Sequence, residues 1–413
     1  MPRQNRFRHQ PYVAWSTPPV PTTVAAVRPD QIATVDAGET LRRLKVRYVF
    51  LVHGTFVGND PFGVAQKIED VTKAVPLFLQ PAFKAFALES WGRVLRSVNQ
   101  QLSGRLMGET GSFRDEYLAD LREYLGQSGP IVERFDWSSG NDHFSRAEAA
   151  IDLFNRLVEL PIDPVEDRVL LWGHSHAGNV FALLSNLLAN DRDSVDQFFQ
   201  ATSGRIESAA NWELARKRLG ATTTPHPLAK ALCLVTMGTP VRYGWDCNGY
   251  SRLLHIVHHR PAAHLPNFIA KPALPQSIDE IVGAKFGDWV QAFGIAGTDL
   301  APVDRCRRET NRALGQLLEI GLDIPQFTND NSPLNRLPNA IRASIQNRMQ
   351  DFSALLARLN CGSRIHADGD AAWLFDYGVD ETEKLGHGTY TKRAWLPFHA
   401  TRIAEWLSQS REK

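Results

Sequence analysis

Short apolar runs recur along the chain, separated by longer stretches in which apolar residues return every three or four positions. An apolar run without polar alternation is typical of a strand that is buried on both faces of a sheet. Such runs occupy residues 46–52, 131–137, 169–172, 231–236 and 371–377. Helical spacing is clearest in residues 146–160, 179–188, 306–318 and 397–407. Because strands and helices alternate, the pattern predicts an α/β fold, with a mostly parallel central sheet and helices on both faces.

Other stretches carry weaker signals. Residues 57–128 show mostly helical spacing and include an apolar, proline-bounded patch at 76–81. Residues 250–281 look irregular. Residues 288–296 alternate like a late strand and run into the turn Gly297-Thr298-Asp299.

The domain organisation follows from these patterns. Residues 1–40 are rich in Pro, Thr and Val, which predicts an extended arm that either projects from the domain or packs over its surface. Residues 41–413 then form one α/β domain. Within it we expect a helical insertion at about 57–128 and a rim or cap insertion at about 245–285.

The composition limits the classes of partner. With 43% hydrophobic residues, 22% charged residues and a net charge of +1, the chain can build a sizeable core and has no basic surplus for nucleic acid. The four cysteines are widely spaced, which argues against a disulfide framework or a CxxC metal site. The sequence shows no signal-like segment and no apolar run of membrane-spanning length. We therefore expect a cytoplasmic protein without a transmembrane segment, with signal-independent export left open.

The candidate chemistry centres on Gly173-His174-Ser175-His176-Ala177. A buried strand precedes this pentapeptide and a strongly apolar helix follows it. A serine on such a sharp strand-to-helix turn needs small neighbours, because the two backbones nearly touch. Gly173 and Ala177 meet that need on either side of Ser175. The alternative is a serine in an ordinary strand–helix loop.

This stretch resembles the α/β-hydrolase superfamily, on its lipase and esterase side, where the motif is usually Gly-x-Ser-x-Gly. Ala177 stands where the family usually has its last glycine. Two further pieces carry the resemblance, His53-Gly54-Thr55 after the strand at 46–52 and Gly238-Thr239-Pro240 after the strand at 231–236. The resemblance implies an α/β-hydrolase fold in which residues 57–128 are either a lid over the substrate or ordinary helices that pack on the sheet.

The resemblance also assigns roles. Ser175 would be the nucleophile, and the N–H groups of Thr55 and His176 would form the oxyanion hole. His387 would be the base, because it lies between two glycines, after the last strand and before the final helix. Asp299, past a late strand, would be the acid, with Asp376 as its rival. Asp246 and Asp370 are weaker candidates, and His53 would support the loop.

Four histidines, His255, His258, His259 and His264, cluster in the irregular stretch. No HExxH-type ligand helix accompanies them, so they predict a pocket wall or rim and not a metal site.

The implied activity is hydrolysis of carboxylic esters, on a small-molecule or lipid substrate, through an acyl-enzyme and without a cofactor or metal. Two alternatives stay open. One is a phospholipase or lipid-directed effector that uses the same triad at a lipid surface. The other is a catalytically silent hydrolase fold that serves as a binding module.

Overall fold

The computed structural model of the protein describes residues 7, 16–31, 35–55, 113–202, 209–270, 280, 283–295, 305–318, 364–378 and 385–409. Most of the predicted helical insertion at 57–128, the turn with Asp299 and the apolar patch at 76–81 lie outside the described residues.

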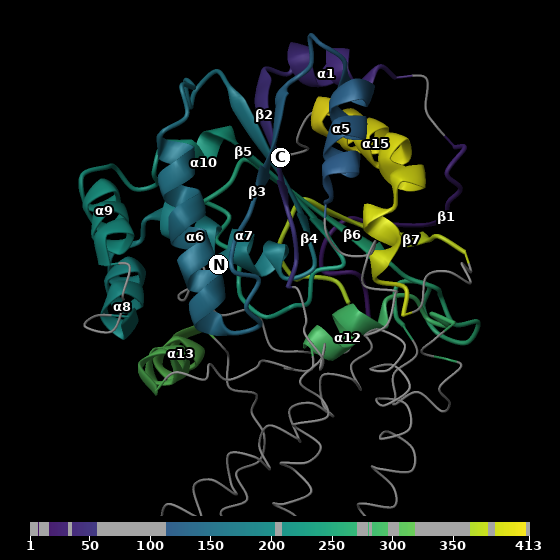
Figure 1. Ribbon diagram of the computed structural model, residues 1–413. Helices are drawn as coiled ribbons and strands as arrows, with labels where there is room; N and C mark the ends of the chain where they lie inside the picture. Colours follow the sequence, from purple (N-terminus) through teal and green to yellow (C-terminus); the bar gives the residue numbers. More distant parts are fainter. Residues whose placement is uncertain are drawn as a thin grey trace, which may run out of the picture.

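A seven-stranded, entirely parallel sheet forms the centre of the molecule (Figure 1). Its strands, in chain order, are β1 (Thr22–Ala26), β2 (Val46–Val52), β3 (Ile131–Phe135), β4 (Arg168–His174), β5 (Leu232–Met237), β6 (Arg252–His258) and β7 (Ala371–Asp376). Their order across the sheet is β1-β7-β6-β5-β4-β2-β3. Because the strands are parallel, the loops that follow them all open at one edge of the sheet, which we call the carboxyl edge.

Helices cover both faces of the sheet (Figure 1). One face carries α1 (Ala37–Arg43), α5 (Asp115–Leu125) and α15 (Leu396–Ser408). On the other face lie α6 (His143–Val158), α7 (Ala177–Ala189), α8 (Arg192–Thr202), α9 (Ala209–Gly220), α10 (Leu228–Ala231) and α13 (Arg305–Leu318). Three short elements complete the described chain: α12 (Trp289–Ile295) and the 3₁₀ helices η4 (Gly388–Thr391) and η5 (Arg393–Trp395).

Strand β4 shows why the apolar runs lack polar alternation. Val169 and Leu171 belong to the core beneath α6 and α7, whereas Leu170 and Trp172 belong to the core beneath α5 and α15. All four side chains are at most 2% exposed, since successive residues of a strand point to opposite faces and both faces are covered. The parallel α/β architecture predicted from the alternation of strands and helices is confirmed.

Two sequence-based expectations were wrong. Residues 288–296, expected as a strand, contain helix α12, which begins after Asp288 because the Asp288 carboxylate caps it by accepting the N–H of Gln291 at 2.8 Å. The stretch 250–281, expected to be irregular, contains β6, a central strand whose residues are all buried. Its two histidines interrupt the apolar pattern, because the groups that bond to His255 and to His258 Nδ1 lie far away in the sequence.

The N-terminal stretch is built into the sheet in part. Strand β1 pairs in parallel with β7, from Thr22 opposite Ala372 to Ala26 opposite Asp376. Phe7 is fully buried and stacks on Phe198 of α8, with ring centroids 5.5 Å apart. Of the two alternatives for this arm, packing against the domain is therefore the one that these residues adopt. None of the helices in the described part of the chain is long and apolar enough to cross a membrane.

Candidate active site

Ser175 lies on a tight turn between β4 and α7, at the carboxyl edge. Its φ of +56° is left-handed, a conformation that a non-glycine residue adopts at a cost of about 1 to 3 kcal/mol. The N–H of Ser175 donates to the carbonyl of Met237 at 2.8 Å, which ties the turn to β5. A Cβ at Gly173 would lie 2.5 Å from the Phe181 ring and 3.0 Å from the Ala177 Cβ. The turn therefore requires the small residues that the sequence places around the serine.

The Gly-Thr-Pro turn after β5 supports the serine from its neighbour strand. The hydroxyl of Thr239 donates to the carbonyl of Ser175 at 2.7 Å. A Cβ at Gly178 would lie 2.2 Å from the Thr239 hydroxyl oxygen, so the first turn of α7 packs directly on this threonine. This contact gives the motif a physical role, since it fixes the backbone of the serine turn.

The His-Gly turn after β2 lies against the serine itself. A Cβ at Gly54 would lie 2.6 Å from the Ser175 Cβ and 3.3 Å from its Oγ. Thr55 follows at once and is half-buried. His53 holds this loop to the end of β3, because its carbonyl accepts the indole N–H of Trp137 at 2.9 Å. Burial lowers the pKa of His53, which fits a neutral, supporting side chain.

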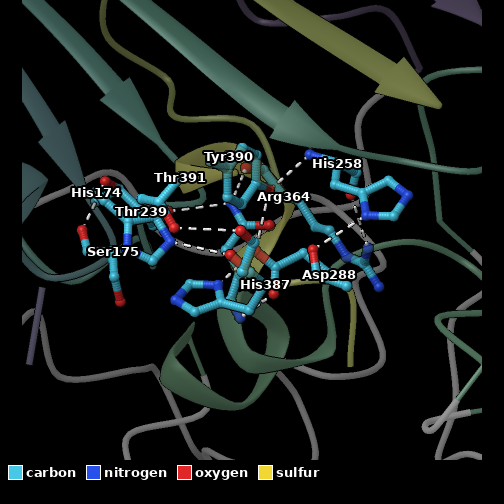
Figure 2. Close-up of polar contacts among 12 residues, drawn as sticks. His174, Ser175, Thr239, His258, Asp288, Arg364, His387, Tyr390 and Thr391 are labelled. Carbon is cyan, nitrogen blue, oxygen red and sulfur yellow. Dashed lines mark hydrogen bonds and ion pairs between the residues drawn. The ribbon is translucent and has the colours of Figure 1, made fainter. Parts of the chain in front are cut away.

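His387, which is partly exposed, pairs with the buried carboxylate of Asp288. Its Nδ1–H donates to Asp288 Oδ2 at 2.7 Å, and the Asp288 carboxylate is 0% exposed (Figure 2). His174, the neighbour of the serine, donates from Nε2 to the carbonyl of His387 at 3.0 Å. Figure 2 shows the His387 imidazole extending toward the side of this cluster on which Ser175 lies. The structure thus brings the serine turn and a His–Asp pair to the same edge of the sheet.

The Asp288 carboxylate is held by donors on both oxygens. Oδ1 accepts the N–H of Gln291, and Oδ2 accepts from His387 and from the hydroxyl of Tyr390 at 3.0 Å. Burial by itself raises the pKa of Asp288, but the charge and hydrogen bond of His387, the Gln291 N–H and the charge of Arg364 lower it below its ordinary value. The carboxylate therefore stays ionised at neutral pH despite its burial.

A glycine makes room for this arrangement. Gly238, of the Gly-Thr-Pro turn, has a φ of +60°. A Cβ there would lie 2.5 Å from the Tyr390 ring and 2.7 Å from Asp288 Oδ2. Only glycine fits this position, because it combines a left-handed backbone with no space for a side chain.

The structure places the predicted site residues as follows. Ser175, His176, Thr55 and His387 all lie at the carboxyl edge. Asp299 lies outside the described residues, and the carboxylate beside His387 is that of Asp288, which is not among the acids expected from the sequence.

The other candidate acids have different partners. Asp376 ends β7 and pairs with Arg260 at 3.3 Å. Asp370 pairs with Arg252 at 3.0 Å, and Asp246 accepts the N–H of Asn248 at 2.9 Å. Among the described carboxylates, these three are therefore held by groups other than His387.

One signal in the sequence could have found Asp288. An Asp followed three residues later by a Gln, before an apolar segment, is typical of a helix N-terminus. Asp288 and Gln291 have this spacing. The alternating apolar residues that follow also fit a strand, and a strand at 288–296 predicts an acid beyond its end, at Asp299.

Three of the clustered histidines, His255, His258 and His259, are buried and bonded within the protein, whereas His264 is exposed. Burial lowers the pKa of His255 to about 3 and that of His259 to about 4. His258 donates from Nδ1 to the carbonyl of Gly386 at 3.0 Å, which anchors the loop that carries His387. Within the described ranges, no three His, Cys, Asp or Glu side chains are grouped so that they could hold a metal ion.

Comparisons with protein-family models, with curated proteins and with solved structures found no match to this chain.

Proposed function

We propose that this chain is a serine hydrolase that cleaves carboxylic esters through an acyl-enzyme on Ser175. The observation that carries the proposal is the left-handed serine turn at the carboxyl edge, together with His387 and its buried partner Asp288 at the same edge. A nucleophile, a base and a group that orients the base are the parts that serine hydrolysis needs.

The strand order supports an α/β-hydrolase type of fold. The serine follows the central strand β4, the acid follows β6 and the histidine follows β7. The chain order Ser175, Asp288, His387 is the order of the triad in that superfamily. The helical cap that the resemblance implies remains part of the proposal.

In the proposed mechanism His387 is the general base. The Asp288 carboxylate accepts a hydrogen bond from Nδ1–H of His387, which leaves Nε2 as the nitrogen that can take the serine proton. Ser175 Oγ then attacks the ester carbonyl, and the carboxylate stabilises the imidazolium that forms. His387 returns the proton to the leaving alcohol. His387 then activates the water that hydrolyses the acyl-enzyme and releases the carboxylic acid product from Ser175.

The negative charge on the tetrahedral oxygen would be stabilised by backbone N–H groups. We assign them to His176, at the start of α7, and to Thr55, after the glycine that lies against the serine. Loss of one such donor typically raises the barrier by about 3 to 4 kcal/mol.

The test is covalent labelling of the purified protein with a fluorophosphonate, followed by hydrolysis of p-nitrophenyl acetate and of phospholipid vesicles. We expect one label per chain, on Ser175, and loss of both label and turnover in Ser175→Ala. Ser194→Ala is the matched control, because this serine is also buried but lies in the first turn of α8, where its hydroxyl donates to Asp191. A folded wild-type protein that takes no label and turns over no ester would contradict the proposal. The ratio of acetate to vesicle turnover identifies the class of ester.

A further inference from the structure

One tyrosine shares the carboxylate oxygen that holds the base. The hydroxyl of Tyr390 donates to Asp288 Oδ2 at 3.0 Å, and Nδ1–H of His387 donates to the same oxygen at 2.7 Å. Tyr390 comes three residues after His387, which caps the 3₁₀ helix η4. Side chains at this spacing lie on one face of a 3₁₀ helix, so one short turn supplies both donors.

The backbone of β6 determines the direction in which the Tyr390 hydroxyl donates its hydrogen. The N–H of His258 donates to the Tyr390 oxygen at 2.7 Å. A backbone N–H can only donate, so the tyrosine oxygen is the acceptor there, and its one hydrogen is left for Asp288 Oδ2. Burial raises the pKa of Tyr390 well above its ordinary value, which keeps the hydroxyl protonated. The strand therefore anchors the tyrosine, and the tyrosine anchors the carboxylate.

We propose that Tyr390 is a positioning residue of this site, which holds Asp288 Oδ2 toward His387 and sets the basicity of that imidazole. The effect on catalysis rests on the function proposed above. An oxygen shared between two donors offers less negative charge to each of them. Without the hydroxyl, Oδ2 would act on His387 alone and favour its imidazolium form. A lone pair of the buried carboxylate would also lose its partner.

Other ionisable groups pack around the pair and must be held constant in any test. They are Arg364 from the segment before β7, His258 from β6, His174 from β4 and Tyr377, which directly follows β7. Tyr390→Phe leaves all of them in place and keeps the ring, so that it isolates the hydroxyl.

Tyr377→Phe is a matched control. Tyr377 is buried and its ring lies 5.9 Å from that of Tyr390, but its hydroxyl bonds to His399 Nε2, at 2.9 Å, and not to the carboxylate. Both substitutions remove one buried hydroxyl from the same aromatic cluster. A purely structural effect should therefore appear in both variants.

The experiment measures the pH dependence of kcat/KM and, independently of turnover, the NMR titration of the His387 imidazole. In Tyr390→Phe we expect two midpoints to rise together by about half to one pH unit: that of the acid limb of the kcat/KM profile and that of the NMR titration of His387. We also expect kcat to fall about tenfold. Tyr377→Phe should have the same pH profile of kcat/KM and the same His387 midpoint as the wild type. A His387 midpoint in Tyr390→Phe equal to that of the wild type overturns the proposal.

Two further readouts separate the possible failures. If the wild type turns over no ester but the His387 midpoint still moves in Tyr390→Phe, the positioning role stands and ester hydrolysis falls. If Tyr390→Phe does not fold, NMR of the wild-type protein provides the test. A slowly exchanging Tyr390 hydroxyl proton, with a nuclear Overhauser effect to the His387 Nδ1 proton, supports the shared Asp288 oxygen. A rapidly exchanging hydroxyl overturns it.

Discussion

Replacing Asp288 with Asn tests the centre of the proposed triad. The amide has nearly the shape of the carboxylate, so packing around this fully buried side chain should change little. Its chemistry changes sharply, because the carboxylate accepts from three donors, on His387, Tyr390 and Gln291. An amide offers one oxygen and an NH₂ group, and at least one of these donors must then face another donor.

The expected loss follows from the tautomer of the base. If the amide NH₂ faces His387, Nδ1 becomes the acceptor and the proton moves to Nε2, which can then no longer accept the serine proton. The same substitution in a serine-protease triad lowers kcat about 10⁴-fold. Because the carboxylate here is completely buried, we expect a loss of about 10³- to 10⁴-fold, or about 4 to 5.5 kcal/mol of barrier.

The assay is single-turnover acylation with p-nitrophenyl acetate, with thermal unfolding as a check on folding. Asp376→Asn is the matched control, since this carboxylate pairs with Arg260 and should leave kcat within about twofold of the wild type. Asp299→Asn tests the acid expected from the sequence. A folded Asp288→Asn variant with wild-type acylation, or a loss confined to Asp299→Asn, would refute the assignment of the acid.

Two further predictions concern the support of the site and its response to pH. Gly238→Ala should lower both the unfolding temperature and kcat, because the new Cβ would meet the Tyr390 ring at 2.5 Å and Asp288 Oδ2 at 2.7 Å; unchanged thermal unfolding and turnover would contradict this. Burial lowers the pKa of His255 to about 3. The unfolded chain therefore takes up a proton that the folded chain rejects, so stability should fall as the pH drops from about 6.5 toward 3, by at most about 1.4 kcal/mol per pH unit. Urea unfolding should show a shallower fall in His255→Gln than in the exposed-site control His264→Gln, and equal slopes would count against the reasoning.

Much of this protein could be predicted from local patterns. The pattern predicts the strand 46–52 to the residue, and it predicts the central parts of the strand and helix around the serine turn, 169–172 of β4 and 179–188 of α7. The residues that specify these elements lie within the elements themselves. An apolar run indicates a strand covered on two faces, and a turn with a left-handed serine needs small neighbours in the sequence. The position of His387, in a glycine-flanked loop after the last strand, was likewise visible in the sequence.

The tertiary structure alone decided which carboxylate meets that histidine. Asp288 and His387 are 99 positions apart in the sequence, and the residues next to either one do not indicate that the two side chains are in contact. The pairing depends on β6, a strand in which buried histidines interrupt the apolar pattern and find their partners elsewhere in the chain, such as Gly386 for His258. An apolar side chain is stabilised by burial against almost any neighbour, so that its pattern can be recognised locally. A buried charge is stable only beside particular donors, and those donors come together only when the whole sheet has formed.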